Sequence, residues 1–122
     1  MAAKILLIED DPTSRSLYEE RFKLEGYEVA SAGDGEEGML KAEAELPEMI
    51  LLDLHLPKAS GFEVLHFLKN NLKTRAIPVF ILTALSGADK KRCLEMGAKG
   101  FFDKSKTKPL ELVEKVNELL IK

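Results

Sequence analysis

Acidic residues follow two apolar segments of the chain, at the point where each segment ends. Residues 5–12 read ILLIEDDP, so Glu9 and Asp10 come directly after four large aliphatic residues. Residues 49–57 read MILLDLHLP, and Asp53 follows its apolar run in the same way. Clustered carboxylates repel one another, and a hard divalent cation with oxygen ligands relieves that repulsion. If the two segments are neighbours in space, these residue types predict an acidic Mg²⁺ site.

Two further polar groups follow apolar segments later in the chain. Residues 79–85 read VFILTAL, in which Thr83 is followed by the small Ala84. Residues 97–105 read GAKGFFDKS and lead to Lys104. A hydroxyl and an ammonium beside a metal-bound carboxylate suit a phosphoryl group, because both donate hydrogen bonds to its oxygens.

These groups have distinct roles in the chemistry that they predict. Asp53 is the candidate nucleophile and would form an acyl phosphate. Mg²⁺ held by Asp10 and Asp53 would neutralise charge on the transferred phosphoryl group. Thr83, the amide of Ala84 and Lys104 would bind the phosphoryl oxygens.

The elements that position these residues follow from the alternation of apolar and amphipathic segments. All-apolar runs are typical of strands buried on both faces of a parallel sheet, whose ligands bind beyond the carboxyl ends of the strands. The predicted strands lie near 4–9, 27–32, 48–53, 77–83 and 99–102. The predicted helices lie near 12–25, 35–46, 61–71, 87–96 and 108–121. Strands that alternate with helices predict an α/β fold with right-handed crossovers.

Several helix ends carry capping signals. Asp11 is placed to cap the first helix, and Asp34 with Glu37 resembles a capping box for the second. Ser60 can cap the third helix.

Composition narrows the class of protein. The 122 residues with a net charge of −3 predict one domain, residues 1–122, without the basic surface of a general nucleic-acid binder. No apolar run reaches the length of a membrane span and no signal peptide is evident, so we expect a cytoplasmic protein. Cys93 is the single cysteine, so no disulfide can form within the chain. The last helix reaches the chain end, so no output domain is expected within these 122 residues, which could still be a piece of a longer protein.

In combination, these features resemble the response-regulator receiver domain of two-component signalling over essentially the whole chain. The residues that carry the likeness are Glu9 with Asp10, Asp53, Thr83 with Ala84, and Lys104. Separated features in the right order are more specific than one short motif. The resemblance implies a flavodoxin-like, doubly wound fold with a five-stranded parallel sheet of order 2-1-3-4-5 and five helices.

The resemblance also implies a mechanism. Asp53 would accept a phosphoryl group from a histidine of a sensor kinase or phosphotransfer protein, with Mg²⁺ as cofactor. The backbone carbonyl of His55 would be a further metal ligand, and Glu9 would act through water. Thr83 and Phe101 would switch on phosphorylation, changing the surface of helix 4, strand 5 and helix 5 that controls a partner protein. No direct binding to nucleic acid or membranes is implied.

One position departs from the family pattern. Proline often follows the lysine in this family, commonly after a cis peptide bond, whereas Ser105 follows Lys104 here. We therefore expect the loop after Lys104 to differ from that of relatives.

Two alternatives remain open beside the signalling switch, which catalyses only its own phosphotransfer and dephosphorylation and is not otherwise an enzyme. A phosphate-independent scaffold of receiver-like fold is one. An aspartyl-phosphate phosphohydrolase resembling the haloacid dehalogenases is the other, although those enzymes have a second aspartate where this chain has His55.

Overall fold

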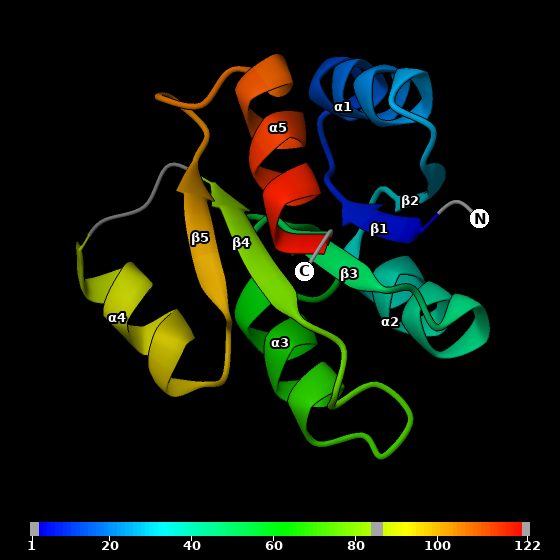
Figure 1. The fold of residues 1–122 in the computed structure, drawn as a ribbon. Helices are drawn as coiled ribbons and strands as arrows, with labels where there is room; N and C mark the ends of the chain where they lie inside the picture. Colours follow the sequence, from blue (N-terminus) through cyan, green and yellow to red (C-terminus); the bar gives the residue numbers. More distant parts are fainter. Residues whose placement is uncertain (1–2, 84–86, 121–122) are drawn as a thin grey trace.

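Five parallel strands form the centre of the structure, a computed structural model that describes residues 3–83 and 87–120. The strands are β1 Lys4–Ile8, β2 Glu28–Ala32, β3 Met49–Leu52, β4 Val79–Thr83 and β5 Gly100–Asp103. Their order in the sheet is β2-β1-β3-β4-β5, and every neighbouring pair is parallel (Figure 1). The predicted α/β fold and strand order are confirmed.

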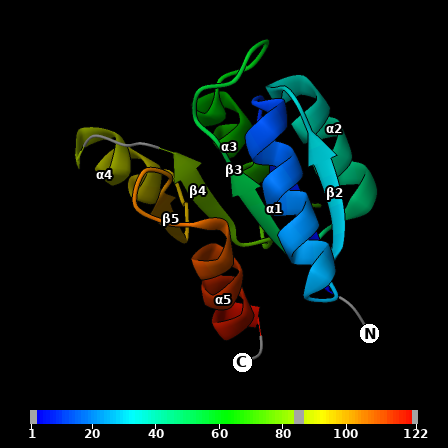
Figure 2. The same ribbon diagram turned by 90° about the horizontal axis from the view of Figure 1, so that it is seen from above.

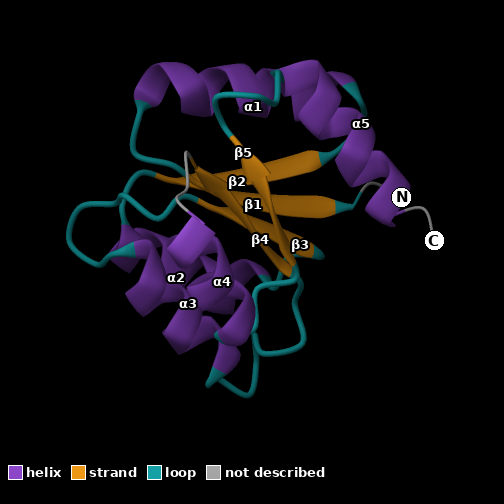
Figure 3. Ribbon diagram, turned by 90° about the vertical axis from the view of Figure 1, so that its left-hand side faces the viewer, coloured by secondary structure: helices purple, strands orange, loops and turns teal. Residues whose placement is uncertain are grey.

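Helices cover both faces of this sheet. The described residues contain α1 Pro12–Leu24, α2 Gly35–Glu45, α3 Gly61–Lys69, α4 Gly87–Glu95 and α5 Pro109–Leu120. One face carries α1 and α5, and the other carries α2, α3 and α4 (Figure 3). Along that second face, α2 and α4 lie at opposite edges of the sheet (Figure 2). Every predicted helix and strand is present, and their ends differ from the prediction by at most two residues.

Two hydrophobic clusters hold these layers together. The first lies under α2, α3 and α4 and includes Ile8, Leu52 and Leu65. The second lies under α1 and α5 and includes Leu7, Phe22 and Val113. Strand residues alternate between the clusters, because successive side chains of a strand point to opposite faces. The apolar runs of β1 and β3 are therefore buried on both sides, as their composition predicts.

The register of the central strands places the acidic residues at one level. Ile8 is paired with Leu52, so β1 and β3 end side by side. The next amides remain in the backbone ladder: Asp53 N–H donates to Ile8 O at 3.0 Å, and Glu9 N–H donates to Ala32 O at 3.0 Å. Glu9 and Asp53 consequently leave the sheet at the same edge.

Helix capping agrees with the sequence in part. Asp11 caps α1 by accepting a hydrogen bond from Ser14 N at 3.0 Å, as predicted. Asp34 accepts from Glu37 N at 2.8 Å, but the Glu37 carboxylate accepts from Gly33 N at 2.8 Å. The predicted capping box is therefore wrong in that detail, because Glu37 satisfies the amide one residue before the cap.

No helix in the part of the chain that the structure describes is both long enough and apolar enough to cross a membrane.

Candidate functional site

Three carboxylates meet at the carboxyl edge of the sheet. Glu9, Asp10 and Asp53 each offer an oxygen atom, and these atoms all lie within 4.8 Å of one another. Glu9 and Asp53 are only 1% and 4% exposed, whereas Asp10 is exposed to solvent. The predicted convergence of the residues that follow β1 and β3 is therefore observed.

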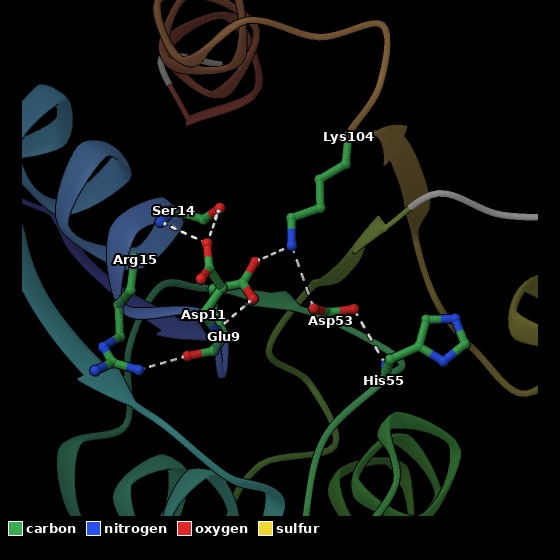
Figure 4. A network of polar contacts seen from close by, with 7 residues as sticks. All are labelled: Glu9, Asp11, Ser14, Arg15, Asp53, His55 and Lys104. Atoms are coloured by element: carbon green, nitrogen blue, oxygen red, sulfur yellow. Dashed lines mark hydrogen bonds and ion pairs between the residues drawn. The ribbon is translucent and has the colours of Figure 1, made fainter.

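The Lys104 side chain extends from the end of β5 into this acidic cluster (Figure 4). Its Nζ forms an ion pair with Glu9 Oε1 and lies 3.4 Å from Asp53 Oδ2. Burial lowers the pKa of Lys104, but the hydrogen bond to Glu9 and the charge of Asp53 outweigh burial and leave the pKa raised. The ammonium group therefore stays charged between two buried carboxylates from two other strands.

Glu9 is fixed by its neighbours in the loop and in α1. Its Oε2 accepts a hydrogen bond from Asp11 N at 3.1 Å, and Arg15 Nη1 donates to its backbone carbonyl at 2.8 Å. Burial is the main cause that raises the pKa of Glu9 to about 7. The hydrogen bond from Lys104 lowers this pKa, and the negative charge of Asp53 raises it. Part of the negative charge of this site is thus left uncompensated by the protein itself.

The donor set fits a hard divalent cation. Three clustered carboxylates face one ammonium, and oxygen is the ligand atom that Mg²⁺ prefers. A cation beside Glu9 would favour the ionised carboxylate against the penalty of burial.

The loop after β3 approaches Asp53 closely. His55 N donates to Asp53 Oδ1 at 3.1 Å, while the His55 residue is itself exposed. A Cβ atom on Gly61 would lie 2.5 Å from Asp53 O, so only glycine lets the first turn of α3 reach this backbone. That turn begins with the predicted cap, since Ser60 forms a full capping box with Glu63. The role of the His55 carbonyl as a metal ligand stays a prediction.

The remaining predicted residues lie around the end of β4 and in β5. Thr83 is the last residue of β4, and its backbone is paired with Asp103. Ala84 lies outside the described residues, so the phosphate-binding and switch roles of Thr83 and Ala84 stay predictions. Phe101 is half-buried, and Lys90 Nζ of α4 lies 4.1 Å from its ring centroid.

Sequence reasoning missed two residues beside the site. Arg15 contacts Glu9 through the geometry of α1, and no local pattern marks that contact. Asp103 organises the loop after Lys104 through hydrogen bonds to Ser105. The Asp-x-Ser spacing is a signal for such a turn, because aspartate side chains bond the backbone two residues on.

Known proteins match this chain over nearly its full length. The family model described as the response regulator receiver domain matches residues 5–117. The response regulator PleD of Caulobacter vibrioides is 40% identical over 112 residues, which cover 91% of this chain and 24% of PleD. The PhoP regulator of alkaline phosphatase synthesis in Bacillus subtilis is 36% identical over 98% of this chain and 49% of that protein. The chain thus spans less than half the length of these curated relatives.

Solved structures show the same likeness. The chemotaxis protein CheY4 of Vibrio cholerae has a TM-score of 0.88 at 27% identity, covering 98% of this chain and 100% of CheY4. The receiver domain of the sensor histidine kinase PA1611 of Pseudomonas aeruginosa has a TM-score of 0.85 at 29% identity, with 97% of each chain covered. That structure has a magnesium ion coordinated in its active site cleft. With the matched family model, the fold and the acidic cluster, these findings show that the chain belongs to the response regulator receiver domains, signalling modules of two-component systems.

Proposed function

We propose that residues 1–122 act as one receiver domain whose Asp53 accepts a phosphoryl group from a phosphohistidine of a sensor kinase or phosphotransfer protein. The observation that carries this proposal is the placement of Lys104 Nζ between the buried carboxylates of Glu9 and Asp53. That arrangement suits an oxygen nucleophile beside a fixed positive charge.

The reaction is a displacement at phosphorus. An Asp53 carboxylate oxygen forms the new P–O bond as the P–N bond to the donor histidine breaks, and the bonding electron pair returns to the imidazole nitrogen. Lys104 stabilises the negative charge of the phosphoryl oxygens as a point charge. The His55 amide orients the Asp53 carboxylate by donating to Oδ1.

Glu9, Asp10 and Asp53 are the residues that would hold Mg²⁺, together with the His55 carbonyl, with Glu9 acting through water. When bound, the cation neutralises charge on the transferred phosphoryl group. Glu9 contributes a buried charge, which the Asp11 amide and the Lys104 ammonium hold in place.

The signal would leave the site through Thr83 and Phe101. Movement of these residues would reshape the surface of α4, β5 and α5, to which a partner protein binds. A partner that prefers the phosphorylated shape shifts the population toward it. The phosphoryl group would later be lost by hydrolysis within the same site.

Phosphorylation by a small acyl phosphate donor, followed by intact mass with and without Mg²⁺, tests this function. We expect wild type to gain one phosphoryl group only when Mg²⁺ is present, and Asp53→Asn to gain none. Glu36→Gln removes an exposed carboxylate of α2 and serves as the matched control, which should behave as wild type.

Failure of wild type to gain a phosphoryl group would favour one of the two alternative functions. If wild type gains no phosphoryl group and does not bind beryllofluoride, the chain is a phosphate-independent scaffold. Repeated turnover of a small phosphoester would instead indicate a phosphohydrolase.

A further inference from the structure

Asp103 accepts four hydrogen bonds from the turn after Lys104. Asp103 Oδ1 accepts from Ser105 N at 2.9 Å and from Ser105 Oγ at 2.6 Å. The backbone carbonyl of Asp103 accepts from Lys106 N at 3.0 Å and from Thr107 N at 2.9 Å. Residues 104–107 are therefore folded back onto the last residue of β5.

Packing against α1 does little to hold this turn. Ser105 and Lys106 are exposed. A cavity of about 330 Å³ lies beside the turn, lined by its own residues and by Ser14, Leu17 and Tyr18 of α1. The hydrogen bonds to Asp103 are thus the contacts that define the course of the backbone here.

The position of Lys104 depends on both of its neighbours. Asp103 is tied to the sheet, because it is paired with Thr83 of β4. Ser105 is tied to Asp103 through its amide and its hydroxyl. Lys104 lies between them, and its long stem must carry Nζ to carboxylates on two other strands. The four-carbon stem of lysine rotates about several bonds and can point in many directions. A backbone that is held on both sides of Lys104 fixes where the stem begins and so limits the positions that Nζ can reach.

We propose that Asp103 is a positioning residue for the phosphotransfer reaction. The hydrogen bonds of its side chain to Ser105 hold the Lys104 backbone so that the ammonium lies between Glu9 and Asp53. Ser105 supplies both the amide and the hydroxyl that bond the Asp103 side chain. This inference rests on the proposed function, in which Lys104 binds the phosphoryl oxygens.

The charge state of Asp103 agrees with this role. The hydrogen bonds from the Ser105 hydroxyl and amide lower the pKa of Asp103, so the side chain is an ionised acceptor at neutral pH. Hydrogen bonds to an ionised acceptor are shorter and stronger than those between neutral groups.

The test compares phosphorylation rates by a small acyl phosphate donor at saturating Mg²⁺. We expect Asp103→Ala to react about tenfold more slowly, since small misplacements of a charge-stabilising group cost this much or more. Asp103→Asn keeps an acceptor oxygen and should stay within about twofold of wild type. Glu36→Gln, which removes an exposed carboxylate of α2, is the matched control and should not change the rate.

A second background separates positioning from a general loss of structure. In Lys104→Ala protein, Asp103→Ala should cause no further loss of rate, because residues that act through one another are not additive. An equal loss in both backgrounds, or no loss in either, overturns the proposal. Thermal unfolding of each variant verifies that the proteins compared are folded.

A readout without phosphorylation distinguishes failure of this inference from failure of the proposed function. The two Hε protons of a fixed lysine have separate resonances, and those of a freely rotating lysine coincide. We expect separate Lys104 signals in wild type and Asp103→Asn, and merged signals in Asp103→Ala. Unchanged signals in Asp103→Ala overturn the positioning role. If the signals merge in Asp103→Ala while wild type gains no phosphoryl group, the positioning role is supported. Only the proposed function is then rejected.

Discussion

Glu9 shows how burial changes the chemistry of a single carboxyl group. It is 1% exposed and shares its surroundings with the carboxylate of Asp53. Burial raises its pKa from 4.5 to about 7, despite the hydrogen bonds from Lys104 and the Asp11 amide. In the metal-free protein the folded state therefore binds this proton more tightly than the unfolded state. The stability that Glu9 contributes is fully present below pH 4.5 and is lost as the pH rises through about 7.

Mg²⁺ binding should depend on pH for the same reason. Below pH 7 a cation competes with the proton on Glu9, so we expect affinity to fall by up to about tenfold per pH unit as the pH drops from 7 to 5. Isothermal titration with Mg²⁺ at several pH values measures this fall. Glu9→Gln lacks the titrating group and should flatten the dependence. An equally steep fall in the variant would assign the proton to another residue.

At the scale of elements, α4 is anchored differently from α3. Of the α4 side chains that the structure describes, 89–95, Cys93 is the one that is buried. Two cations of α4 lie over aromatic rings instead: Lys90 over Phe101 at 4.1 Å and Arg92 over Phe62 at 4.0 Å. By contrast, α3 buries three aliphatic side chains, namely Val64, Leu65 and Leu68. A helix with little buried apolar area opens at lower free energy than one with more.

Hydrogen exchange should reveal this difference. We expect α4 amides to exchange faster than α3 amides, and Lys90→Gln or Arg92→Gln to increase α4 exchange about two- to fivefold, because each loses a cation–π contact of roughly 0.5–1 kcal/mol. The intervening Lys91 is exposed and serves as the matched control through Lys91→Gln. Equal exchange in all three variants would show that the ring contacts do not hold α4.

Gly38 of α2 packs against β1, the strand that Glu9 follows. A Cβ atom at this position would lie 2.7 Å from Ile8 Cδ1, in a fully buried side chain. Gly38→Ala should gain about 1 kcal/mol of helix propensity but lose about 2 kcal/mol to overpacking, a net loss near 1 kcal/mol. Urea unfolding measures the net change. Ala44→Gly, at an exposed position of the same helix, is the control that measures the contribution of helix propensity alone. A Gly38→Ala variant more stable than wild type would show that the Ile8 side chain moves aside.

At the scale of the whole molecule, the site joins strands that hold the fold together. Glu9, Asp53 and Lys104 follow β1, β3 and β5, and the two hydrophobic clusters pack against the same sheet. Unfolding separates these strands and therefore disperses the acidic cluster. A ligand that binds only the folded state stabilises the protein by mass action.

Mg²⁺ should consequently raise the unfolding temperature. At a concentration about 100 times Kd the gain is about 2.7 kcal/mol, or roughly 10 °C for a domain of this size. Differential scanning calorimetry with Mg²⁺ and after chelation measures the gain. Asp53→Asn should lose most of it, whereas Glu36→Gln should retain it. A gain of the same size in Asp53→Asn would place the effect of Mg²⁺ elsewhere on the protein.

The sequence by itself determined the alternation of strands and helices and the residues at the carboxyl edge, whereas the strand order followed from the resemblance to receiver domains. Apolar runs identify β1 and β3 because strands buried on both faces need no polar alternation, and Glu9 and Asp53 are where those runs end. Tertiary structure alone decided that Glu37 bonds Gly33, that Lys104 pairs with Glu9 as well as facing Asp53, and that Asp103 shapes the turn beyond it. Periodicity reports which face of an element is buried. These contacts depend instead on which atoms come within a few ångströms once separate segments are packed together.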